Sequence, residues 1–205
     1  SAHFNSSLNS GIENLNSPDL VSGDLKTGSV FFKLGSSSQE SMKGMVVRTQ
    51  KDGAAAGTAK GIEINADVSS VIFLHACANE AVNKKAYDMI YNFDDSSDLL
   101  GWYEVLYEDG FVETVPIRYG VNILDWRWQQ RVTKNEKEKA KYSQNKYAYE
   151  APAVQCSRDL QKPVTFFAFE WESARFGKKI RTISLKPAEF TKNNDNAVIL
   201  LALSV

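Results

Sequence analysis

The clearest hydrophobic–polar alternation in this chain surrounds the dipeptide Asp109-Gly110. Before it, the apolar residues Tyr103, Val105 and Tyr107 occupy every second position, and after it the alternation continues through residues 111–117. An Asp-Gly pair between two alternating segments is a strong signal for a β-hairpin. In both segments one face is more apolar than the other, as is typical of antiparallel strands with one side on a core. The pattern therefore predicts an antiparallel hairpin centred on this dipeptide.

Other apolar runs predict further strands on both sides of the hairpin. They lie at residues 30–34, 42–49, 61–65, 71–77, 119–126, 163–172, 179–185 and 197–205, with short ones near 147–149 and 154–156. Residues 71–77 are apolar on both faces, which indicates a central strand covered on both sides. Residues 79–98 and 131–146 do not alternate, and a short helix or a loop is expected in each.

The number and spacing of these strands predict the fold class. About ten strands without a long amphipathic helix are typical of an all-β protein, here a two-sheet antiparallel β-sandwich of jelly-roll or Greek-key type. At 205 residues the chain has a suitable length for a single sandwich domain spanning residues 1–205. Residues 1–28 are rich in Asn, Ser and Gly, so we expect them to be largely loop that wraps the domain.

Composition narrows the classes of partner. The 24 basic and 25 acidic residues give a net charge of −1, so no basic face for duplex nucleic acid is expected. The longest apolar run, residues 197–203, is too short to cross a bilayer. The chain begins with Ser1-Ala2-His3 instead of Met, which indicates a processed or excised segment that could have lost a leader.

The cysteines and one histidine offer little reactive chemistry. Cys77 and Cys156 could form one disulfide in an oxidising compartment, but two buried free thiols are the favoured interpretation. They do not cluster with histidine, which argues against a zinc site. His75 lies within an apolar strand, so a hydrogen-bonded core residue is favoured over a general base.

Several phrases in a fixed order resemble a known family. They are Ile72-Phe73-Leu74-His75, Tyr103-x-Val105-x-Tyr107-x-Asp109-Gly110, Pro116-Ile117-x-x-Gly120-x-Asn122-Ile123-x-Asp125-Trp126, and Trp171-Glu172 followed by Lys179-Ile180-Arg181-Thr182-Ile183. Together they resemble a galactose-binding-like jelly-roll domain of large secreted bacterial proteins that carry glycoside hydrolase domains. The resemblance covers nearly the whole chain. One departure is visible, because such domains usually continue Trp-Glu with Asn-Pro, whereas Ser173-Ala174 follows here.

The resemblance implies a noncatalytic accessory β-sandwich, for which carbohydrate recognition is a common but not universal task. It implies an extracellular, periplasmic or cell-surface location and a neighbouring catalytic domain. No cofactor is expected, although the resemblance allows a structural calcium. Asp94-Asp95 and Asn193-Asn194-Asp195 provide the oxygen ligands that such an ion prefers.

The predicted polysaccharide or oligosaccharide site is Asp125-Trp126-Arg127-Trp128. Sugars present apolar faces and hydroxyl groups, so their sites combine aromatic rings with planar hydrogen-bonding groups. On an extended backbone Trp126 and Trp128 would project from the same face, with Asp125 and Arg127 orienting hydroxyls. Structural roles for both indoles are the alternative. Tyr149, with Tyr147, is a secondary candidate because both follow a polar segment and share a face.

Two other functions remain open from the sequence. The domain could be purely structural, packing against a catalytic domain through an interface that is rich in aromatic residues. It could also be a glycoside hydrolase with Glu170 and Glu172 as paired carboxylates, about 7 Å apart along one face of a strand. Surface charges paired with Arg175 or Arg181 are the favoured interpretation of these glutamates. Exposed indoles beside Asp and Arg would favour sugar binding, and burial would favour the structural role.

Overall fold

A computed structural model describes residues 6–7, 20–34, 43–49, 61–80, 99–130, 148, 150–189 and 196–205. Within this part nearly all regular structure is β, apart from a single helical turn at residues 128–130. The strands are β1 (Ser6–Ser7), β2 (Gly23–Thr27), β3 (Val30–Leu34), β4 (Lys43–Arg48), β5 (Ile62–Ala66), β6 (Ser70–Cys77), β7 (Leu99–Tyr107), β8 (Val112–Arg118), β9 (Ala153–Gln155), β10 (Thr165–Glu172), β11 (Ile180–Pro187) and β12 (Ala197–Ser204).

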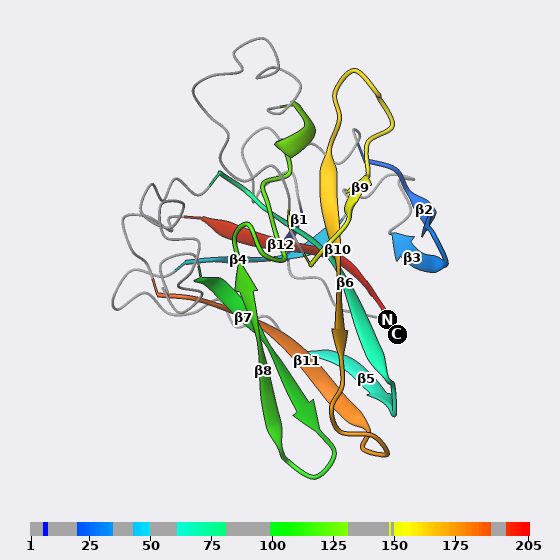
Figure 1. Ribbon diagram of the computed structural model, residues 1–205, viewed down its shortest axis with the longest axis vertical. Coiled ribbons are helices and arrows are strands. Elements are labelled where there is room, and N and C mark those ends of the chain that lie inside the picture. Colours follow the sequence, from blue (N-terminus) through cyan, green and yellow to red (C-terminus); the bar gives the residue numbers. More distant parts are fainter. Residues whose placement is uncertain are drawn as a thin grey trace.

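These strands form antiparallel sheets, which confirms the predicted all-β sandwich. One sheet has the order β1-β4-β12-β6-β10-β9 and a second has the order β5-β11-β7-β8, while β2 and β3 form a separate hairpin (Figure 1). Every strand pair is antiparallel. Apart from β7–β8 and β9–β10, neighbours in the two large sheets are far apart in sequence, so the fold depends on long-range pairing.

Strand β6 lies at the centre of the larger sheet, between β12 and β10. Its residues Val71 and Phe73 belong to a core between the two large sheets, which we call the inner core. Its residues Leu74 and Ala76 belong to a second core, the outer core, which also contains Phe32 of the β2–β3 hairpin. Both faces of β6 are therefore covered, as its continuous apolar sequence predicted.

The predicted hairpin is present as β7 and β8. Tyr103 pairs with Val115 and Leu106 with Val112, and Gly110 at φ 85° completes the turn. Tyr103, Val105 and Tyr107 all point into the inner core, as their alternation requires. The turn of this hairpin and the connection from β10 to β11 both lie at the lower end of the molecule in Figure 1. We call this end the tip.

Two segments differ from the sequence expectation. Gly23–Thr27, expected to be loop, forms β2 because pairing with β3 lets Leu25 pack on the outer core. Residues 119–126, expected to be a strand, instead turn at Gly120 (φ 81°) and make only isolated bridges. The side chain of Asn122 fixes that turn, because its Nδ2 donates to Pro116 O (3.0 Å) and its Oδ1 accepts from the Arg118 amide (2.9 Å).

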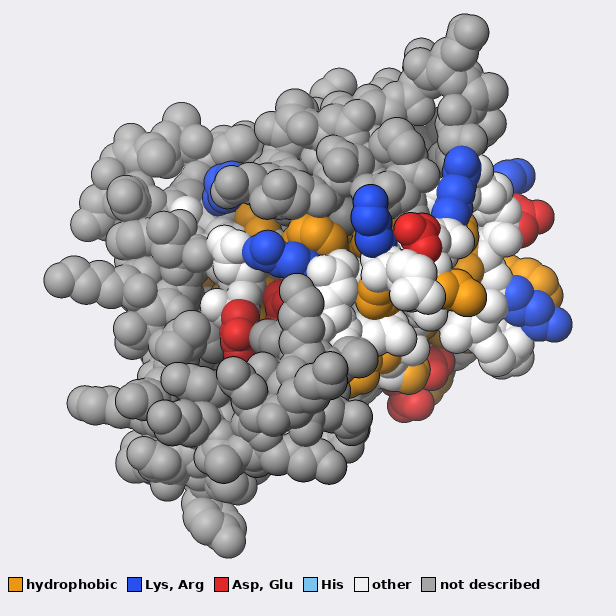
Figure 2. Space-filling model, turned by 90° about the horizontal axis from the view of Figure 1, so that it is seen from above, with side chains coloured by type: hydrophobic (Ala, Val, Ile, Leu, Met, Phe, Trp, Pro, Cys, Tyr) orange, Lys and Arg blue, Asp and Glu red, His pale blue; other side chains and the backbone are white. Residues whose placement is uncertain are grey.

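Charge is mixed on the described surface. On the face shown in Figure 2, Lys and Arg side chains alternate with Asp and Glu and with apolar groups, so neither sign dominates there. No helix of the described residues has the length and apolarity needed to span a membrane.

Candidate functional site

The structure places two members of the predicted sugar site in the interior. Asp125 and Trp126 are only 3% and 4% exposed. They are held against β6, because the Trp126 amide donates to Cys77 O (3.1 Å) and the Cys77 amide donates to Leu124 O (3.0 Å). Asp125 accepts a hydrogen bond from the Tyr119 hydroxyl (3.2 Å). The Arg127 guanidinium lies 5.1 Å from the Trp126 ring centre.

The expectation that Trp126 and Trp128 share a face is wrong. The chain is not extended here, because the Trp128 amide donates to Asp125 O (2.9 Å) and a helical turn begins at residue 128. Trp126 therefore packs in the outer core, whereas Trp128 packs edge-on against Phe167 of the inner core, with ring centres 6.1 Å apart. Trp128 is partly exposed, so it is the indole of this set that a ligand could reach. Tyr147 and Tyr149 lie outside the described residues.

The paired glutamates are on the surface. Glu170 and Glu172 are both exposed on β10, opposite Ile72 and Ser70 of β6. The ion pair that Arg175 makes is with Asp109 rather than with either glutamate. The protein does not enclose these carboxylates.

His75 is a core residue, as the sequence predicted. It is fully buried, its Nε2 donates to Asn122 O (2.8 Å) and its Nδ1 accepts from the Tyr103 hydroxyl (2.7 Å). Burial lowers the pKa of His75 to about 4, against the opposing effect of the Asn122 hydrogen bond. The imidazole is therefore neutral and inaccessible, and it holds the 119–126 turn to β7 and β6.

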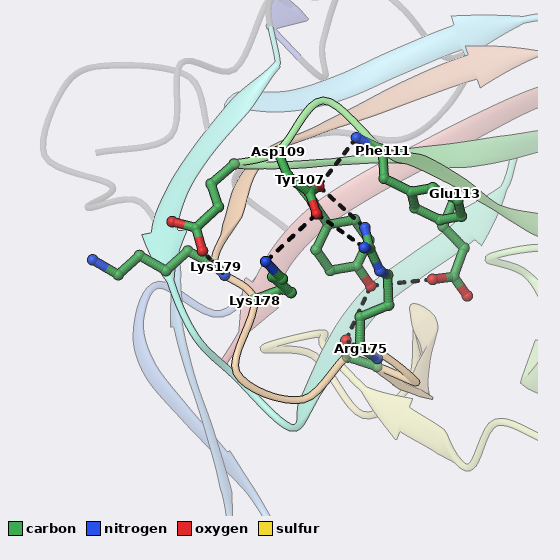
Figure 3. A network of polar contacts seen from close by, with 9 residues as sticks. Tyr107, Asp109, Phe111, Glu113, Arg175, Lys178 and Lys179 are labelled. Atoms are coloured by element: carbon green, nitrogen blue, oxygen red, sulfur yellow. Dashed lines mark hydrogen bonds and ion pairs between the residues drawn. The ribbon is translucent and has the colours of Figure 1, made fainter.

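The structure also brings together a group of residues that sequence reasoning missed. We call it the tip cluster, and it consists of Tyr107, Asp109 and Phe111 from the β7–β8 hairpin and Arg175 and Phe176 from the β10–β11 connection. Arg175 donates two hydrogen bonds to Asp109 (3.1 and 2.9 Å), as Figure 3 shows. Its guanidinium carbon lies 4.9 Å from the Tyr107 ring centre and 4.2 Å from the Phe111 ring centre.

These contacts fix the polar groups of the tip cluster. The Arg175 hydrogen bonds are the largest of the effects that hold the pKa of Asp109 below its usual value. Each cation–π contact at an exposed site contributes about 0.5–1 kcal/mol. The Tyr107 hydroxyl donates a hydrogen bond to Glu113 (3.1 Å). It also forms a hydrogen bond with Ser173 Oγ (3.0 Å). Ser173 thus connects the end of β10 to the hairpin.

The tip cluster also presents apolar surface to solvent. Phe111 is 50% exposed and Phe176 is 79% exposed, and Val112 next to Phe111 is 44% exposed. Contiguous exposed apolar surface often marks a binding site, so the exposed rings of the tip make it a candidate. Exposed aromatic rings beside a guanidinium and a carboxylate were predicted at residues 125–128, and the structure has this combination at the tip instead.

Metal binding finds no support among the described residues, where no group of three His, Cys, Asp or Glu side chains could hold an ion. The residues proposed for calcium, Asp94-Asp95 and Asn193-Asn194-Asp195, lie outside this part of the chain. Cys77 and Cys156 are buried thiols that take part in no disulfide, as favoured from the sequence. Burial raises the pKa of the Cys156 thiol to about 12.

Comparisons of the chain with protein-family models, with curated proteins and with solved structures find no match. Interpretation of the function therefore depends on the sequence resemblance and on the geometry described above.

Proposed function

We propose that this chain is a noncatalytic accessory domain that binds carbohydrate for a secreted or cell-surface polysaccharide-processing protein of bacteria. The observation that supports this proposal is the tip cluster. Exposed rings of Phe111 and Phe176 lie there beside a guanidinium and a carboxylate that hold each other in place. Sugar rings have apolar C–H faces and hydroxyl edges, to which such a set of groups is complementary. Because Arg175 and Asp109 are already ordered, a ligand would lose little entropy in fixing them.

The arrangement of the acidic and basic residues supports a noncatalytic role. Most glycosidases place two carboxylates across the scissile bond, one as acid and one as base or nucleophile. Glu170 and Glu172 lie open to solvent on a strand surface. His75 is sealed in the core, and Asp125 is buried beneath Tyr119. His75 and Asp125 are therefore out of reach of a bound sugar, and Glu170 and Glu172 are not enclosed as an acid–base pair would be.

Affinity electrophoresis in gels that contain a series of soluble polysaccharides tests the proposal. The wild-type chain should be retarded by at least one polysaccharide and should release no reducing sugar from it. The variant Phe176→Ala should be retarded less than the wild type, because it removes the most exposed ring of the tip cluster. Phe31→Ala is the matched control, since Phe31 is 60% exposed but lies on the β2–β3 hairpin. Migration unaffected by every polysaccharide would contradict sugar binding.

The same gels test the predicted role of Trp128. If Trp128→Ala loses retardation while its unfolding curve stays close to wild type, the sugar contacts the 125–128 segment as well. The unfolding curve is needed because Trp128 also packs against Phe167.

A second candidate is a purely structural domain that packs against a neighbouring catalytic domain. The burial of Asp125 and Trp126 favours this structural role, because only Trp128 of the two predicted indoles is then partly exposed to a ligand. Exposed Phe and Arg side chains are also frequent in protein interfaces. This candidate predicts no retardation on any polysaccharide.

A further inference from the structure

The segment that carries Arg175 and Phe176 is strongly basic. Residues 175–181 include Arg175, Lys178, Lys179 and Arg181 and contain no acidic residue. This local excess of positive charge contrasts with the near balance of the whole chain, whose net charge is −1. The basic residues at the tip therefore gather on the β10–β11 connection, opposite the carboxylates of Glu108, Asp109 and Glu113 on the hairpin.

Only part of this charge is neutralised within the protein. Asp109 forms a close ion pair with Arg175 (2.9 Å) and lies 3.8 Å from the Lys178 ammonium. Among the described residues, no carboxylate lies within ion-pair distance of the side chains of Lys179 and Arg181. Two nearby carboxylates keep their charge but contact neutral donors, because Glu108 accepts from the Lys179 backbone amide (3.2 Å) and Glu113 accepts from the Tyr107 hydroxyl (3.1 Å).

Backbone geometry directs these cations outward beside an aromatic ring. Ile180 is buried in the inner core, so its neighbours Lys179 and Arg181 are directed to solvent, and both are exposed. Gly177 at φ 74° turns the chain between Phe176 and the lysines. The tip therefore presents an aromatic ring that is 79% exposed on the same connection as Lys179 and Arg181, whose side chains form no ion pair with a described residue.

We propose that the tip cluster together with residues 178–181 is a binding site for acidic polysaccharide, whose sugars carry carboxylate or sulfate groups. This inference rests on the proposed carbohydrate-binding function and adds the chemical class of the ligand. A sugar ring stacks on Phe176, and its anionic group is held by Lys178, Lys179 and Arg181. A neutral glycan at the same place would cover these cations without supplying a charge partner, which costs desolvation free energy.

Affinity electrophoresis of the whole chain in gels containing polygalacturonate, chondroitin sulfate or neutral galactomannan tests the inference. We expect stronger retardation by an acidic polymer than by the neutral one, and the two acidic gels distinguish carboxylate from sulfate recognition. Because Phe176→Ala removes the stacking contribution of one ring, its apparent Kd should be roughly two- to tenfold weaker. The double variant Lys179→Gln/Arg181→Gln should lose the preference for acidic polymers. Raising the salt from about 0.1 M to about 1 M should weaken retardation, because the Debye length falls from ~10 to ~3 Å.

A matched control excludes a general effect of surface charge and apolarity. On the β2–β3 hairpin, Phe31 is 60% exposed and the Lys26 ammonium lies 5.0 Å from its ring centre. The double variant Phe31→Ala/Lys26→Gln should bind like wild type. If it loses as much affinity as the tip variants, the site assignment is overturned.

Other outcomes separate this inference from the proposed function. Equal retardation by galactomannan and the acidic polymers overturns the acidic preference but leaves carbohydrate binding intact. Absence of retardation by all three polymers overturns the inference. Binding to vesicles of phosphatidylserine and phosphatidylcholine that the tip variants abolish, without retardation by acidic polymers, would assign the tip to a lipid surface instead.

Discussion

The buried histidine makes a quantitative prediction about stability in mild acid. His75 is fully buried, with both ring nitrogens hydrogen-bonded inside the core, to Tyr103 and to the backbone of Asn122. Burial lowers the pKa of its imidazole to about 4. In the unfolded chain the same group is exposed and titrates near its ordinary pKa of about 6.5.

The sign of the effect follows from this difference. Below a pH of about 6.5 the unfolded chain binds a proton that the folded chain does not, so acid favours unfolding. The stability that the neutral imidazole provides is fully present above this pH and is lost as the pH falls to about 4, the folded-state pKa. Since one pKa unit corresponds to ~1.4 kcal/mol, His75 should lower the free energy of unfolding by about 3 kcal/mol across this window.

Denaturant unfolding of the whole chain at a series of pH values measures this loss. Comparison with His75→Phe isolates the contribution of the group, because phenylalanine suits the stacked aromatic surroundings of Tyr103 and Phe169 and cannot titrate. In the variant the free energy of unfolding should fall less steeply as the pH decreases, because unfolding takes up one proton fewer than in the wild type. His3→Gln removes the other histidine of the chain and should leave that contribution unchanged.

An NMR titration of the wild-type imidazole gives an independent reading that does not require the variant to fold. The His75 ring signals should not move between about pH 7 and pH 5.5, where an ordinary histidine titrates. A midpoint near the ordinary pKa, or an equal pH slope in wild type and His75→Phe, would refute the assignment of His75 as a neutral core residue.

Three further predictions concern other parts of the structure. Gly101→Ala should lower the free energy of unfolding by about 1–3 kcal/mol, since its Cβ would collide with the backbone oxygen of Lys186 on β11; unchanged denaturation would contradict this packing. Arg175→Gln should raise the pKa of Asp109 toward its ordinary value, as measured by NMR titration of the carboxylate; an unchanged pKa would show that the ion pair is not formed in solution. Cys156, whose pKa burial raises to about 12, should react with thiol reagents at neutral pH only after unfolding; rapid labelling of the native chain detected by mass spectrometry would show that it is accessible.

The parts of the fold that local patterns encode were predictable from the sequence. Alternation around Asp109-Gly110 identified the β7–β8 hairpin, and the continuous apolar run at 71–77 identified a central strand. The turn at 119–126 was not predicted, because it depends on the left-handed Gly120 and on hydrogen bonds from the Asn122 side chain. Strand β2 was missed for a related reason, since its burial depends on packing over the outer core.

The candidate site was harder to predict than the fold. An indole-rich phrase at 125–128 suggested a platform, but the helical turn at Trp128 sends its two indoles into different cores. The tip cluster depends on contacts between Asp109 and Arg175, which are 66 residues apart in sequence. The one local signal was the run of four cations from Arg175 to Arg181, interrupted by Phe176, Gly177 and Ile180. Only the three-dimensional pairing of hairpin and connection shows which of those charges remain available.

Screening the wild-type chain on a glycan array that spans neutral, uronate-containing and sulfated structures tests the central claim most directly. We expect the chain to bind one class of glycan selectively and to leave the array ligands uncleaved. A chain that is folded by circular dichroism yet binds no glycan on the array, or that cleaves those it binds, would contradict it.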